Sequence, residues 1–361
     1  MHFCQASGHA FLGVSLLPAA FLLDAQQAAP APSQAAPPPT LTVQVQLVNL
    51  PVIVRNKNGV LVTTLGKDDF ALAVDSRQQP IRYFDRDDNL PLTLGLLVDI
   101  SGSVRSALDE ERTASEAFFD EMVLSPAGQP PDEAFLIQFA HQVDLLQDRT
   151  PSVPKLRTAL QRVGDEPRND AQDRNNSGYG GYGHRRGFRG GTTLYDAIYL
   201  GSTDVMQKQE GRKAIVVLTD GEDRGSMETV NNAIAAAQRA ETVVYAIYFQ
   251  GEQHGYGGRG GFGGRGGYPG GGGRGGEQHV DGRKVLEQIT RETGGRMFEV
   301  SGKQTFAAIY SQIDEELRSQ YRLGYVPDAN TAAPGFHRIE LTLVKDKKLS
   351  IQTRGGYYGR D

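Results

Sequence analysis

The chain has 361 residues, which is long enough for two domains, and 39% of them are apolar, which is enough to form a hydrophobic core. Its net charge of −5 argues against a protein that binds polyanions over its whole surface. The single cysteine, Cys4, excludes an internal disulfide bond.

The first organised feature is an apolar run from Ala10 to Leu23, which is followed by small residues. This run is short for a membrane span and has the length of a signal-peptide core. We therefore predict a signal peptide over residues 1–25 and an exported protein, either periplasmic or secreted and associated with the cell envelope. Cleavage would leave no stable transmembrane segment. A retained N-terminal anchor is the alternative, because no lysine or arginine precedes the run.

Two segments of different character precede the main domain. Residues 26–40 are rich in alanine, proline and glutamine without apolar periodicity, which predicts a flexible linker. Residues 41–86 are rich in strand patterns separated by polar turns. The expected strands are Leu41–Val54, Val60–Leu65, Phe70–Val74 and Pro80–Phe84.

From residue 91 to 319 the pattern alternates between strands and helices. The runs Leu94–Val98 and Ala214–Leu218 are continuously apolar, as expected for strands covered on both faces. Helices are expected at Ser106–Val123, Val153–Val163, Leu194–Gln207, Glu228–Ala240, Gly282–Thr293 and Gln304–Ser319. This alternation predicts an α/β fold with a doubly wound, mainly parallel sheet and helices on both faces.

The C-terminal segment, residues 320–361, returns to strand patterns at Tyr321–Val326, His337–Val344 and Leu349–Thr353. A tail of three strands cannot be very stable alone, and the N-terminal strands have the same weakness. We therefore predict that residues 320–361 pair with residues 41–86 to form a small flanking β domain. An independent N-terminal module is the alternative.

Two glycine- and arginine-rich insertions, residues 165–191 and 251–276, interrupt the α/β pattern. Stretches of this composition bury too little surface to offset their ordering entropy, so we expect disorder. Their arginines are Arg174, Arg185, Arg186, Arg189, Arg259, Arg265 and Arg274. Arginine with interleaved aromatic residues is also typical of RNA-binding tails, but export disfavours a nucleic-acid partner. We expect the arginines to favour an anionic partner.

Oxygen-bearing side chains follow the predicted buried strands. Asp99, Ser101 and Ser103 come directly after Leu94–Val98, in the sequence DISGS. Thr192 opens the helix after the first insertion, and Asp220 ends the strand Ala214–Leu218. Ligands of open α/β sheets bind at the carboxyl ends of the strands, where these residues would converge. Such hard oxygen donors suit Mg²⁺, Mn²⁺ or Ca²⁺ and do not suit zinc.

The three motifs DISGS, GGT and TDGE resemble the metal-ion-dependent adhesion site of the von Willebrand factor type A (VWA) family, over about Leu92 to Ser319. The resemblance implies that Asp99, Ser101, Ser103, Thr192 and Asp220 are the metal ligands. Thr193 is the less favoured threonine, since GGT aligns through Thr192. In that family the serines and the threonine contact the metal, the aspartates mostly hold it through water, and an acidic side chain of the partner takes the remaining position. The flanking segments are similar to a bacterial, exported branch of the family.

We therefore predict a binding module that captures an acidic group of a protein partner through a Mg²⁺, Mn²⁺ or Ca²⁺ ion. A structural protein of the cell envelope with self-associating glycine-rich loops is the alternative. A Mg²⁺-dependent hydrolase has less support, because the sequence contains no GxxxxGK[ST] loop and no GxSxG motif. We expect no enzymatic activity and no small-molecule substrate.

Overall fold

The computed structural model describes residues 47–86, 90–104, 107–123, 130–165, 191–249, 281–328, 330–346 and 348–359. These residues belong to one compact unit, Val45–Asp361. The predicted signal peptide and linker lie outside the described residues, as do both insertions except Asp165 and Gly191. No helix in the described ranges is both long enough and apolar enough to cross a membrane.

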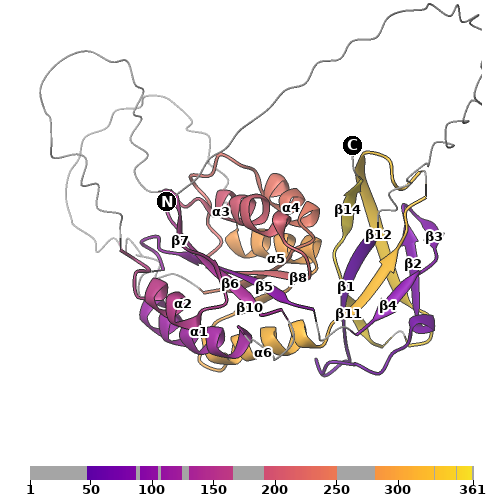
Figure 1. The fold of residues 1–361 in the computed structure, drawn as a ribbon, viewed down its shortest axis with the longest axis horizontal. Coiled ribbons are helices and arrows are strands. Elements are labelled where there is room, and N and C mark those ends of the chain that lie inside the picture. Colours follow the sequence, from indigo (N-terminus) through magenta and orange to yellow (C-terminus); the bar gives the residue numbers. More distant parts are fainter. Residues whose placement is uncertain are drawn as a thin grey trace, which may run out of the picture. The chain divides into compact units, whose positions relative to one another are not determined.

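The α/β part is built around a six-stranded sheet with the strand order β10-β9-β8-β5-β6-β7 (Figure 1). Its strands are β5 (Leu92–Asp99), β6 (Glu133–Phe139), β7 (Val143–Thr150), β8 (Arg212–Thr219), β9 (Val243–Tyr248) and β10 (Met297–Glu299). All neighbouring strands run parallel except β7, which is antiparallel to β6. Every residue of β5 is buried, because helices cover both faces of the sheet.

Helices α1 (Leu108–Met122), α2 (Val153–Leu160) and α6 (Phe306–Arg318) cover one face of this sheet, and α3 (Leu194–Leu200), α4 (Val230–Arg239) and α5 (Gly282–Thr293) cover the other (Figure 1). Side chains of β5 alternate between the two cores. Leu96 packs in the core with α1, α2 and α6, whereas Leu97 packs in the core with α3, α4 and α5. The predicted fold class is therefore confirmed.

The flanking β part contains two four-stranded sheets, with the orders β13-β1-β11-β4 and β14-β12-β2-β3. The N-terminal strands are β1 (Val48–Arg55), β2 (Phe70–Val74), β3 (Arg77–Gln79) and β4 (Tyr83–Asp85). The C-terminal strands are β11 (Tyr321–Tyr325), β12 (Gly335–Leu343), β13 (Ser350–Gln352) and β14 (Gly356–Gly359). Strand β1 pairs with β11 and β13, and β2 pairs with β12, so both segments contribute to each sheet.

The β part differs from expectation in two places. The predicted strand Val60–Leu65 is wrong, because it forms only an isolated bridge between Leu61 and Arg55. Strand β14 was not expected, since its sequence, GYYG, begins and ends with glycine, a residue that weakens strands. Within its described residues, the C-terminal segment therefore contains four strands instead of three.

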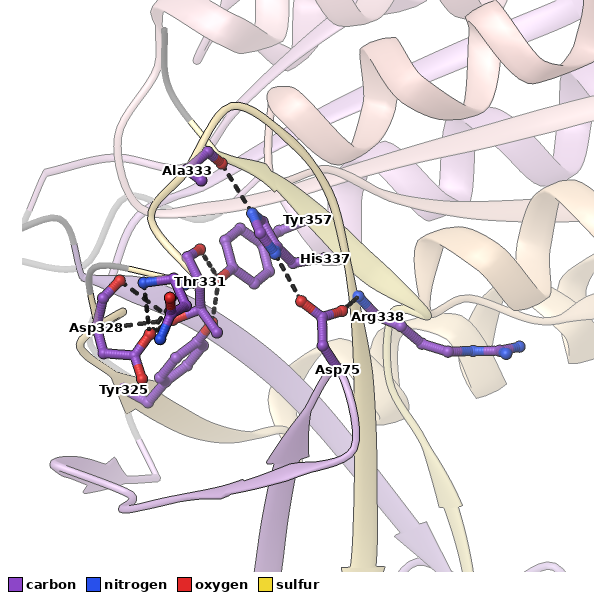
Figure 2. Close-up of polar contacts among 9 residues, drawn as sticks. Asp75, Tyr325, Asp328, Thr331, Ala333, His337, Arg338 and Tyr357 are labelled. Carbon is purple, nitrogen blue, oxygen red and sulfur yellow. Dashed lines mark hydrogen bonds and ion pairs between the residues drawn. The ribbon is translucent and has the colours of Figure 1, made fainter.

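A buried histidine joins the loop before β12 to the β2–β3 turn (Figure 2). Nδ1 of His337 lies 2.8 Å from Oδ2 of Asp75, and its Nε2 lies 2.8 Å from the carbonyl oxygen of Ala333. Both neighbours are acceptors, so only the imidazolium form can donate to both. Burial lowers the pKa of His337, but its bonds to Ala333 and Asp75 outweigh burial and raise the pKa above its ordinary value of 6.5.

We expect His337→Gln to lower the free energy of unfolding at pH 6 by about 1.5–3 kcal/mol, the usual value of hydrogen bonds to charged groups. A raised histidine pKa stabilises the fold fully below pH 6.5, and this stabilisation is lost as the pH rises through the folded pKa. Denaturant unfolding from pH 5.5 to 8.5 should show the two proteins converging as the pH rises. A constant difference would contradict a charged histidine.

Candidate metal centre

The loop after β5 begins with a fully buried carboxylate. Asp99 is 0% exposed, at the last residue of the strand. Its Oδ1 accepts a hydrogen bond from the backbone N–H of Ser101 at 2.8 Å, and its Oδ2 accepts one from Oγ1 of Thr219 at 2.7 Å. Both carboxylate oxygens are therefore held before any ligand binds, which fixes the direction of the loop that follows.

The two serines of this loop connect it to the loop after β8. The hydroxyl oxygens of Ser101 and Ser103 lie 3.2 Å apart, and Oγ of Ser103 donates to Oδ2 of Asp220 at 2.5 Å. Strands β5 and β8 are parallel neighbours, with Val98 opposite Leu218, so their carboxyl ends lie at the same edge of the sheet. The structure therefore brings Asp99, Ser101, Ser103 and Asp220 together in one hydrogen-bonded cluster.

Thr192 lies two residues before α3, which begins at Leu194. It is buried, and its carbonyl oxygen accepts hydrogen bonds from the backbone N–H groups of Arg224 and Gly225, both at 3.1 Å. These two residues belong to the loop that begins at Asp220. The neighbouring Thr193 is also buried, and its hydroxyl oxygen has no hydrogen-bond partner in the described part of the chain. Thr192 is therefore held against the loop after β8, whereas the backbone N–H of Thr193 donates to the carbonyl oxygen of Ala140, after β6, at 2.8 Å.

The electrostatics of the cluster favour a cation. The pKa of Asp99 is raised to about 6, mainly by burial and to a smaller extent by the negative charge of Asp220, against the opposing hydrogen bonds of Thr219 and Ser101. Desolvation and the second carboxylate both penalise the ionised form of Asp99. A bound divalent cation would relieve both penalties, since it supplies positive charge beside two carboxylates and two hydroxyls.

The type of donor limits the choice of metal. Among the described residues, no three histidine, cysteine, aspartate or glutamate side chains are grouped so that they could hold an ion together. An ion at this edge of the sheet would therefore depend on serine and threonine hydroxyls in addition to the two carboxylates. Oxygen donors of this kind fit Mg²⁺, Mn²⁺ or Ca²⁺.

Sequence reasoning missed one residue of the site, Thr219. Its buried hydroxyl donates to Asp99 and accepts from the backbone N–H of Gly221 at 3.0 Å, so it connects the two loops. Thr219 stands directly before Asp220 in TDGE, but its position in the motif does not reveal that its side chain turns toward β5. The arginines of both insertions lie outside the described residues.

When the chain is compared with models of known protein families, part of it matches one family. Residues 94–222 match the family model described as the von Willebrand factor type A domain. No curated protein matches the chain by sequence.

Solved structures with a similar arrangement include an aerotolerance-related membrane protein from Bacteroides fragilis, with 16% identity, a TM-score of 0.39, and coverage of 63% of this chain and 98% of that one. A second is the vWF domain of the type V pili tip protein Mfa5 from Porphyromonas gingivalis, with 10% identity, a TM-score of 0.40, and coverage of 63% and 97%. A third is proximal thread matrix protein 1 from the mussel byssus, solved with a zinc-occupied MIDAS motif, with 12% identity, a TM-score of 0.41, and coverage of 68% and 49%.

Proposed function

The chain carries a von Willebrand factor type A domain, and from this premise we propose that it is a metal-ion-dependent binding module for a protein partner. In this proposal Asp99, Ser101, Ser103, Thr192 and Asp220 hold a divalent cation, with Mg²⁺, Mn²⁺ and Ca²⁺ as the candidates. The cation supplies the positive charge that a carboxylate of the partner binds. The protein would act outside the cytoplasm, as its N-terminal apolar run indicates.

The hydrogen-bonded cluster at the ends of β5 and β8 is the observation that carries the proposal. Oγ of Ser103 donates to Asp220 from one loop to the other, and Thr219 donates to Asp99 in the opposite direction. Two loops that are distant in sequence thus present oxygen atoms at one edge of the sheet. Asp99 orients the first loop through the N–H of Ser101, so it would act by positioning the serine hydroxyls as well as by its charge.

The role assigned to these residues is binding and orientation. No proton transfer or covalent step is required of them, because a carboxylate of a partner needs only an accessible cation. The sequence also allows a structural protein of the cell envelope and a Mg²⁺-dependent hydrolase, and the described residues favour neither. The glycine-rich loops of the scaffold hypothesis lie outside the described ranges.

We expect Asp220→Ala to abolish binding of Mn²⁺ and Mg²⁺ in calorimetric titration while the domain stays folded, since Asp220 lies in a loop at the edge of the sheet. The affinity should fall by more than the roughly 10–100-fold that loss of a supporting residue costs. Asp204→Ala, at an exposed aspartate after α3, is the matched control and should bind normally. Unchanged affinity in Asp220→Ala would exclude the site.

Partner capture is tested separately, with the protein immobilised and exposed to native envelope extract. A partner that depends on the proposed site should bind in Mg²⁺, dissociate in EDTA, and be lost with Asp220→Ala but not with Asp204→Ala. Free acetate at high concentration should compete, because it offers the same carboxylate. A partner that binds equally well in EDTA would contradict metal-mediated capture.

A further inference from the structure

Two glycines from different elements are in direct backbone contact beside Asp220. A Cβ atom added to Gly282, the first residue of α5, would lie 2.5 Å from the carbonyl oxygen of Asp220 and 2.6 Å from the carbonyl carbon of Gly221. A Cβ atom added to Gly221 would lie 2.4 Å from the carbonyl oxygen of Gly282. Real Cβ atoms do not approach backbone this closely, so the contact exists only because both residues are glycine.

The backbone at Gly221 is linked to both carboxylates of the proposed metal site. Its N–H donates to Oγ1 of Thr219 at 3.0 Å, and the same hydroxyl donates to Asp99. The next N–H, that of Glu222, donates to Oδ1 of Asp220 at 3.0 Å. A shift of this loop by a few tenths of an ångström would therefore disturb the hydrogen bonds that orient Asp220 and Asp99.

Helix α5 is too firmly anchored to yield in place of the loop. The carboxylate of Asp281 caps its N-terminus by accepting from the N–H of Arg283 at 3.2 Å, and Arg283 pairs with Glu299 of β10 at 2.9 Å. Further along the same buried face of the helix, Leu286 and Ile289 pack in the core. The loop after β8 has no such anchor of buried apolar side chains, so a larger residue at position 282 should displace the loop.

We infer that Gly282 is a positioning residue of the metal site. Because it has no side chain, the backbone of Asp220 and Gly221 packs directly against the first turn of α5, and this contact sets the affinity for the divalent cation. This inference rests on the proposed function, since it concerns the same site. The inference adds helix α5 to the site, which otherwise consists of the loops after β5 and β8. No side chain of α5 belongs to the ligand set.

The test is Gly282→Ala, with Mn²⁺ affinity measured by calorimetry and folding measured by circular dichroism. Alanine is favoured over glycine in helices by up to about 1 kcal/mol, so helix propensity does not explain a loss of function. We expect the Mn²⁺ affinity to fall at least about tenfold, the scale of a lost supporting residue, while the variant remains folded at the temperature of the titration. Gly302→Ala is the matched control, because a Cβ there meets nothing within 4 Å, and it should bind like the wild type.

A second measurement uses the wild-type protein, so it does not depend on how the variant folds. Saturating Mg²⁺ should slow hydrogen exchange in the first two turns of α5 and leave α2 unchanged, because coupling between two sites is reciprocal. Equal Mn²⁺ affinity in Gly282→Ala and wild type, or no protection of α5 by Mg²⁺, would overturn the role of Gly282 and leave the metal site intact. A wild type that binds neither ion would overturn the proposed function itself, and the inference with it.

Discussion

Replacing Glu316 with alanine is expected to lower the free energy of unfolding by about 3–5 kcal/mol, the cost of leaving buried charges without their partner. The carboxylate of Glu316, on α6, is only 3% exposed and forms ion pairs with two arginines. One is Arg55 of β1, and the other is Arg296, whose Nη2 lies 2.9 Å from Oε1 of Glu316. Without the carboxylate, the guanidinium groups of Arg55, whose side chain is 10% exposed, and Arg296, whose side chain is 35% exposed, would lose the negative charge that both of them contact.

Because Arg55 belongs to the flanking β part, this cluster also connects that part to α6. Denaturant unfolding measures the stability, with Glu315→Ala as the control, since Glu315 is the exposed neighbour on the same helix. The control should change the stability by no more than about 0.5 kcal/mol, as is usual for surface positions. A similar small effect in Glu316→Ala would show that the three charges are solvated and do not hold the two parts together.

The second large effect is expected for Glu111→Gln, which should make the protein more stable than the wild type at alkaline pH. Burial raises the pKa of this carboxyl group, on α1, from 4.5 to about 8, although Ser115 donates to its Oε1 at 3.2 Å. Its Oε2 is buried without a hydrogen-bond partner among the described residues. Ser115 in turn hydrogen-bonds Tyr310 of α6 at 2.8 Å, so the group lies in the contact between α1 and α6.

The sign of the pH dependence follows from which state holds the proton. Between pH 4.5 and about 8 the folded protein keeps the proton of Glu111 and the unfolded chain has lost it. Stability therefore falls as the pH rises through this window, by about 1.4 kcal/mol per pH unit. Glutamine is neutral at every pH, so Glu111→Gln should remove this slope and exceed the wild type by on the order of 4 kcal/mol at pH 8.

Unfolding free energies measured from pH 5 to 9 in EDTA check this prediction independently of any metal. Glu110→Gln is the control, since it makes the same chemical change at the exposed neighbouring residue and should retain the slope of the wild type. If Glu111→Gln kept that slope, Glu111 would be ionised in the folded protein, and the contact between α1 and α6 would have to contain water.

Local sequence patterns determined most of the secondary structure. Strand β2 and helix α5 have the bounds that their apolar periodicity predicts, Phe70–Val74 and Gly282–Thr293. The unbroken apolar runs of β5 and β8 predicted strands covered on both faces, and strand–helix alternation then left few topologies other than a doubly wound sheet. Since both runs end in polar motifs, the sequence also indicated the edge of the sheet where Asp99 and Asp220 meet.

The tertiary structure decided which distant segments pair. Strand β1 lies between β11 and β13, which follow it by more than 250 residues. Periodicity shows which face of a strand is apolar but not which partner strand covers it, because pairing depends on competition among all available edges. The weak pattern of β14 became a strand only because β12 offered it an edge.

The details of the site were decided in the same way. Sequence identified Ser103 and Asp220 as oxygen donors, but only the fold shows that Thr219 connects the two loops and that Gly221 requires a glycine at position 282. A motif specifies which chemical groups occur at short spacing along the chain. Contacts between loops depend on how the backbones pack in three dimensions, and at Gly221 and Gly282 the decisive feature is a missing side chain, which no local pattern distinguishes from an ordinary turn or helix start.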